Sequence, residues 1–181
     1  MGIMLKIFIF FMLFMHTSVY AQSEHMNHEN HKDHEHHKTD QMRAPHSFDE
    51  SMGKILTEYL RIYNILLSGK TDHLKEMSEN IAQMAKKLDL TSVASEHAGH
   101  YNKIPINLVN SSESLGRSGD ISSAREAFRK LSQPMAMWVS MARPTGYAVM
   151  FCPMVKASWV QKEGQVQNPY DEAMPHCGDK V

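Results

Sequence analysis

Six histidines lie close together near the N-terminus. Five recur at every third position and a sixth falls inside the same stretch: His25, His28, His31, His34, His37 and His36. Because a polyproline-II chain has three residues per turn, this spacing would place the recurring imidazoles along one edge. Neutral imidazole binds Cu(II), Ni(II) and Zn(II), and Cu(II) is favoured among divalent ions. The pattern predicts an arm that captures divalent metal; the alternative is a solvated polar leader that binds metal only incidentally.

Soft ligands gather near the C-terminus. Cys152-Pro153-Met154 brings a thiol close to a thioether, and the short run around Met174, His176 and Cys177 adds a thioether, an imidazole and a thiol. Sulfur ligands of this kind select Cu(I). The two cysteines could instead form a disulfide, which would close a loop of about 26 residues and stabilise the fold by roughly 3.5 kcal/mol in the chain-entropy model. Ligation and a disulfide both stay open, and they could be redox alternatives.

Three weaker candidates have simpler structural explanations. Met135, Met137 and Met141 could form a metal-transfer path, but methionine is a common core filler. His97 and His100 could share a helix face, although such histidines are more often structural or exposed. Trp159 could cover a cation. We expect it to pack in the core instead.

The first 21 residues resemble an export signal more than a part of the fold. Lys6 precedes an apolar run from Ile7 to Met15, and Val19-Tyr20-Ala21 suits signal peptidase. The run is too short to span a bilayer as a helix. We therefore expect cleavage after Ala21, a periplasmic or secreted mature chain, and no membrane segment after cleavage; an uncleaved anchor is the alternative.

The composition is that of a globular protein with one compact domain. The chain has 181 residues, is 22% charged and 42% hydrophobic, and carries a formal net charge of −1. Without a basic excess we expect no nucleic-acid partner. The unusual counts are 12 His and 15 Met against 2 Cys. Only two cysteines exclude a disulfide-dense scaffold and a four-cysteine zinc site.

Apolar residues recur with helical spacing over most of the chain. Residues 22–46 lack this periodicity and are predicted to be a disordered arm. The periodicity predicts helices over about 47–69, 71–88, 92–115 and 120–142, with Ser47 and Asp120 as caps, a kink or split at Pro105 and a bend at Pro134. Four amphipathic segments joined by short turns indicate an all-α domain, 47–181, built as an antiparallel four-helix bundle.

The pattern changes after the last predicted helix. Tyr147, Val149 and Phe151 alternate with Ala148, Met150 and Cys152, which indicates an extended segment. The remaining residues, from Pro153 to Val181, are predicted to form a long irregular tail. Long irregular segments of compact domains are often functional.

The tail also resembles a known bacterial family. The matching residues are Tyr147-Ala-Val-Met-Phe-Cys152-Pro153-Met154, Ser158-Trp159, Asn168-Pro169-Tyr170, Met174 and Cys177-Gly178, with Ala124-Arg125-Glu126-Ala127-Phe128 upstream. They are similar to domain of unknown function 3347, found in stand-alone exported proteins and at the C-terminal end of periplasmic adaptor subunits of copper/silver-type efflux pumps. The resemblance implies extracytoplasmic copper handling, with Cys152, Met154, Met174 and Cys177 as matching motif positions. His176 is a candidate on its chemistry alone.

Together these patterns lead to one hypothesis and one alternative. The hypothesis is a non-enzymatic, exported metal-binding accessory protein, with Cu(II) or another divalent ion at the arm and Cu(I) at the tail or an efflux adaptor docked there. The alternative is a disulfide-pinned interaction module in which Asn168-Pro169-Tyr170 helps to form a docking surface. A Cys152/His176 hydrolase is disfavoured because no motif of an activated nucleophile accompanies the pair.

Overall fold

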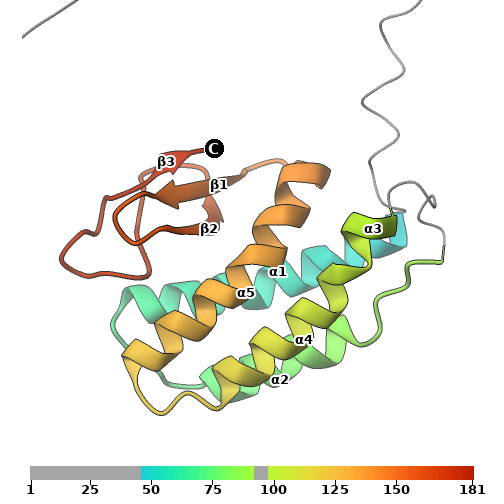
Figure 1. Ribbon diagram of the computed structural model, residues 1–181, viewed down its shortest axis with the longest axis horizontal. Helices are drawn as coiled ribbons and strands as arrows, with labels where there is room; N and C mark the ends of the chain where they lie inside the picture. The colour runs from blue at the N-terminus through green and yellow to red at the C-terminus, as the bar shows by residue number, and fades with distance from the viewer. Residues whose placement is uncertain (1–45, 92–97) are drawn as a thin grey trace, which may run out of the picture. The chain divides into compact units, whose positions relative to one another are not determined.

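The computed structural model describes residues 46–91 and 98–181, in which the chain forms helices followed by a small sheet. The elements are α1 (His46–Leu67), α2 (Leu74–Ala85), α3 (Ala98–Tyr101), α4 (Lys103–Gly116), α5 (Ile121–Ala142), β1 (Tyr147–Cys152), β2 (Ala157–Lys162) and β3 (Asp179–Lys180) (Figure 1). The predicted signal peptide, and the predicted arm as far as residue 45, lie outside the described residues. The four long helices confirm a mostly helical fold, whereas the antiparallel bundle arrangement stays a prediction.

The first two helices follow the predicted stripes but differ at their ends. α1 begins at His46, one residue before the predicted cap, and ends shortly before Gly69, which takes a positive φ of 67°. α2 begins at Leu74, later than the predicted start near residue 71. The prediction was wrong here because the residues before Leu74 form a turn, and the N-cap residue His73 is left-handed and makes no side-chain capping bond.

The third predicted helix is divided, but not at the proline. α3 ends at Tyr101, Asn102 follows, and α4 begins at Lys103. Pro105 therefore lies in the first turn of α4. A proline is tolerated there because its missing N–H would have had no partner within the helix.

α5 confirms the predicted cap. Asp120 is extended, its carboxylate accepts from the Ser123 backbone N–H at 2.8 Å, and the Ser123 hydroxyl pairs with the Asp120 N–H at 3.2 Å. This reciprocal pair is a capping box. Pro134 lies inside the helix, which continues to Ala142; the bend expected at Pro134 stays a prediction.

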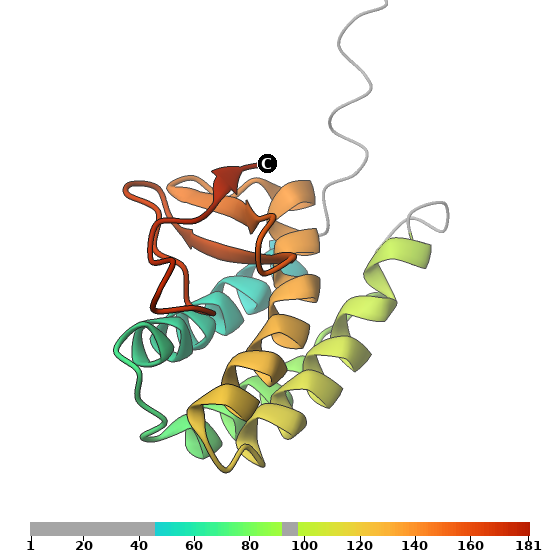
Figure 2. The same ribbon diagram turned by 60° about the vertical axis from the view of Figure 1, so that its left-hand side comes forward.

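The apolar stripes of the helices meet in one core. Its largest fully buried side chains include Trp159, Tyr59, Tyr101, Phe48 and Phe128. α2 packs against α1 and α4, and α5 packs between α4 and the sheet (Figure 2). Small residues let α2 and α4 approach closely: a Cβ placed on Gly116 would lie 3.4 Å from the Cβ of Ser78.

The predicted irregular tail is wrong in part, because it contains two of the three strands. β1 pairs antiparallel with β2 and with β3, in the order β2-β1-β3. β2 was not predicted because its sequence lacks the alternation of apolar and polar residues that marks a half-exposed strand. Five of its six residues form an unbroken run that is buried or half-buried. β3 has only two residues.

Other parts of the chain pack against the sheet. β1 and β2 contact α5, and the hydroxyl of Tyr59 on α1 accepts a hydrogen bond from the Val160 N–H at 3.0 Å. The face that carries Cys152 and Trp159 is covered by the last residues of the chain, which we call the C-terminal segment, 163–181. No helix of the described residues is long and apolar enough to cross a membrane.

Candidate functional site at the C-terminal segment

A disulfide joins the two cysteines that the sequence singles out. Cys152 ends β1 and Cys177 lies just before β3, with their Cα atoms 5.4 Å apart. Cys152 is completely buried, whereas Cys177 is half-buried. Of the two alternatives left open by the sequence, the structure has the disulfide. In this oxidised form neither sulfur is a thiolate, so metal ligation by the cysteines stays a prediction for the reduced protein.

The other predicted tail ligands lie on two loops. Met154 is in the connection between β1 and β2 and is 69% exposed. Met174 is half-buried, and its carbonyl accepts from the Asn168 side chain at 3.0 Å. His176 is exposed, and its Nδ1 lies 3.0 Å from the carbonyl oxygen of Val166. Facing an acceptor, Nδ1 carries the proton in the neutral ring, which leaves the Nε2 lone pair free to bind a metal.

The Asn-Pro-Tyr motif has a structural role. Asn168, Pro169 and Tyr170 are all buried, which contradicts the expectation that they form a docking surface. The Asn168 backbone N–H donates to Pro175, and its side-chain oxygen accepts from the Tyr170 N–H. The Tyr170 hydroxyl donates to the Ser158 carbonyl at 2.7 Å. The motif therefore closes its own loop and fastens that loop to β2.

Trp159 packs in the core, as expected. Its indole N–H donates to the Gln161 side-chain oxygen at 3.0 Å, and its ring meets Tyr170 edge-on. Gln161 is buried, and its amide group also donates to the Gln165 carbonyl and accepts from the Gln167 N–H. The tryptophan is held by a satisfied polar network.

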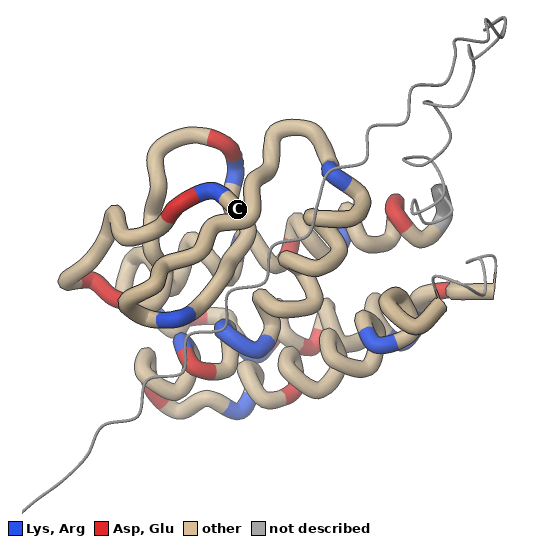
Figure 3. The backbone as a smooth tube through the Cα atoms, turned by 45° about the horizontal axis from the view of Figure 1, so that its top comes forward, with Lys and Arg blue, Asp and Glu red and all other residues tan. Residues whose placement is uncertain are grey.

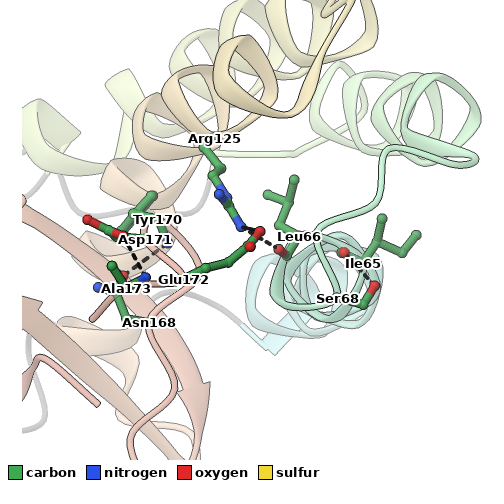
Figure 4. A network of polar contacts seen from close by, with 9 residues as sticks. All are labelled: Ile65, Leu66, Ser68, Arg125, Asn168, Tyr170, Asp171, Glu172 and Ala173. Atoms are coloured by element: carbon green, nitrogen blue, oxygen red, sulfur yellow. Dashed lines mark hydrogen bonds and ion pairs between the residues drawn. The ribbon is translucent and has the colours of Figure 1, made fainter. Parts of the chain in front are cut away.

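Two arginines to which the sequence assigned no role of their own hold the loops of this region against α5. Arg125 donates to the Glu172 carboxylate at 2.6 Å and to the Leu66 carbonyl at 3.3 Å (Figure 4). Arg129 donates to the Val155 carbonyl at 2.9 Å, and its guanidinium lies 5.7 Å from the centre of the Tyr170 ring. Their spacing of four residues on a helix is the signal that could have found them, because it places both on one face.

Buried tyrosines make this region sensitive to alkali. Burial raises the pKa of Tyr63 to about 12 and also raises the pKa values of Tyr59 and Tyr170 above the ordinary value of 10. The unfolded chain therefore releases these protons first as the pH rises. We expect a constant free energy of unfolding between pH 8 and 9, and a fall from about pH 10 through pH 12, as each folded-state pKa is approached.

Urea unfolding across this pH range measures the effect. The variant Tyr63→Phe removes one of the titrating hydroxyls, so its stability should fall less steeply above pH 10 than that of the unchanged protein. Tyr63 also donates to the Gln167 carbonyl, so its replacement changes the stability at neutral pH as well. The comparison therefore uses the slope of the free energy of unfolding against pH. A wild-type stability that stays level up to pH 12 would contradict the prediction.

The remaining candidates among the described residues do not join the site as a cluster. Met135 is buried in the core, Met141 is half-buried against it and Met137 is exposed. His100 is exposed, whereas His97 and the six arm histidines lie outside the described residues. Within residues 46–91 and 98–181, no group of three or more His, Cys, Asp or Glu side chains is placed to hold a metal ion. Charges of both signs are interspersed over the helices and loops (Figure 3).

Comparison with known protein families identifies a family. A family model described as "Protein of unknown function (DUF3347)" matches residues 55–145. The chain belongs to the DUF3347 family. The match runs from α1 to the residues after α5, so in this protein the DUF3347 region is the helical part that supports the sheet. Comparisons with curated proteins and with solved structures gave no match.

Proposed function

We propose that the protein is an exported, non-enzymatic accessory protein that binds metal, with copper as its main metal. The observation that carries the proposal is the histidine pattern of residues 25–37, which precedes the helical domain. Imidazoles at this density capture Cu(II) and other divalent ions. The folded domain then acts as the carrier of the arm, and cleavage after Ala21 would release the chain into the periplasm or the medium.

The C-terminal segment is the second part of the proposal. In the reduced protein, Cys152 and Cys177 would offer two thiolates at one place, with Met174 and His176 on the same short run as Cys177. Met154 would add a thioether from the loop that follows β1. Such a set suits Cu(I). The same surface would dock a periplasmic partner such as a heavy-metal efflux adaptor, which receives the ion.

Metal titration of the unchanged protein and of two variants tests the arm. Deletion of residues 25–37, or replacement of the six histidines by Gln, should reduce the bound Cu(II) or Zn(II) per chain without unfolding the helical domain. The Gln variant is the matched control because it keeps the length of the arm. Binding should also weaken below about pH 6, where imidazoles become protonated. Equal stoichiometry in all three chains would contradict the role of the arm.

The second candidate function is a disulfide-pinned interaction module without a specific metal site in the folded domain. It is favoured by the Cys152–Cys177 bond and by the number of contacts that fix the C-terminal segment. Titration of the reduced, arm-free chain with Cu(I) separates the two. About one Cu(I) per chain that is lost on Cys152→Ser supports a tail site; no retained Cu(I) supports the interaction module.

A further inference from the structure

The two sulfurs of the disulfide are not equally accessible from outside. Cys152 is completely buried, and its cross-strand partner Ala157 is buried as well. Cys177 is half-buried and lies between the exposed His176 and the half-buried Gly178. In thiol–disulfide exchange the incoming thiolate must reach one sulfur directly. Of the two cysteines, only Cys177 has exposed surface in the folded protein.

We propose that the disulfide is a thiol-exchange site at which an external dithiol attacks Cys177 and Cys152 is the leaving group. The attacking thiolate forms a bond to Sγ of Cys177 as the Cys152–Cys177 bond breaks, and the Cys152 sulfur leaves with the electron pair and takes a proton from water. The second thiol of the dithiol then attacks the mixed disulfide and releases Cys177, which is protonated in turn. The protein gains two electrons and two protons, and the external dithiol is oxidised to a disulfide.

The C-terminal segment is held by contacts that do not involve the disulfide, so exchange does not require unfolding. Glu172 is paired with Arg125 on α5, and the Tyr170 hydroxyl donates to the Ser158 carbonyl on β2 at 2.7 Å. Asn168 bonds to the carbonyls of Met174 and Pro175 on the run that leads to Cys177. β3 is also paired with β1. After reduction these contacts keep Cys177 near Cys152, so the bond can reform.

This proposal goes beyond the proposed function and does not depend on metal. If the protein also binds Cu(I) through its thiols, which rests on the proposed function, exchange at Cys177 would decide when these ligands are available. The tests of thiol exchange therefore use metal-free protein with a chelator present. A failed metal titration leaves their outcome unchanged.

Trapping with glutathione tests the direction of attack. The oxidised full-length protein is incubated with glutathione at pH 8, quenched with excess N-ethylmaleimide in denaturant so that the buried Cys152 also reacts, and mapped by peptide mass spectrometry. We expect glutathione on the peptide that contains Cys177 and N-ethylmaleimide on Cys152. Glutathione mainly on Cys152 would overturn the proposal. So would a disulfide that resists glutathione in the native state and reacts only in denaturant.

Single-cysteine variants test the same asymmetry independently. Cys152→Ser leaves the Cys177 thiol, and Cys177→Ser leaves the Cys152 thiol. In native protein, 5,5′-dithiobis(2-nitrobenzoate) should react roughly ten times or more faster with Cys177 than with Cys152, and in denaturant the rates should become similar. Similar native rates in two folded variants would count against the assignment. If either variant fails to fold, the glutathione experiment on the unchanged sequence decides.

Discussion

Replacing both cysteines by alanine should lower the free energy of unfolding by about 3.5 kcal/mol, because the disulfide closes a loop of about 26 residues in the unfolded chain. The bond joins β1 to the end of the C-terminal segment, so it restricts nearly all of the chain that follows the helices. Truncation of the buried Cys152 adds a small packing loss. Urea unfolding of the double variant Cys152→Ala/Cys177→Ala against the oxidised protein measures the difference.

Reduction of the unchanged protein is the matched control for that experiment. It opens the same loop without removing the sulfur atoms, so its loss of stability should be close to that of the double variant and slightly smaller. Amide exchange should quicken in residues 163–181 more than in α1 or α5, since the loss of the cross-link mainly permits local opening. A double variant as stable as the oxidised protein would mean that the unfolded chain gains little freedom when the loop is opened.

The helices were predictable because each buries one regular stripe. In α5, Phe128, Leu131 and Met135 follow the helical spacing and are fully buried. The start of that helix was also predictable, because the Asp120 side chain caps it by accepting a hydrogen bond from the nearby Ser123 N–H. The start of α2 could not be predicted in the same way. There the N-cap residue is His73, which is left-handed and makes no side-chain capping bond, so its residue type gave no capping signal.

The candidate site was less predictable because it depends on contacts between distant parts of the chain. The sequence contained the two cysteines but left open whether they meet, since that depends on the path of residues 153–176. The side chain of the buried Gln161 has hydrogen-bond partners on several other residues, among them Trp159, Gln165 and Gln167, a role that the residue type alone does not reveal. The Asn-Pro-Tyr motif was noticed for its residues, yet its polar groups face inward and close a loop.

Gly178→Ala should destabilise the C-terminal segment by about 2–4 kcal/mol, through a clash and through backbone strain. A Cβ at this position would lie 2.5 Å from Cη2 of Trp159 and 3.2 Å from Cγ1 of Val166, and Gly178 has a φ of 153°. Trp159 is completely buried and tied to Gln161, so its ring cannot swing aside. The segment would have to lift from the sheet. Urea unfolding measures the loss, and near-ultraviolet circular dichroism reports the packing of Trp159.

Gly164→Ala is the matched control, because Gly164 also has a positive φ, of 141°, but a Cβ there would meet nothing within 4 Å. Gly164→Ala should show the effect of backbone strain alone, a loss of about 1 kcal/mol in the free energy of unfolding. Equal losses for the two variants would mean that the contact with Trp159 is unimportant. Combining Gly178→Ala with the loss of both cysteines separates the contact from the cross-link. Without the cross-link the segment is held only by its other contacts and yields to the clash with Trp159 at a lower cost, so the second loss should be smaller than in the oxidised protein.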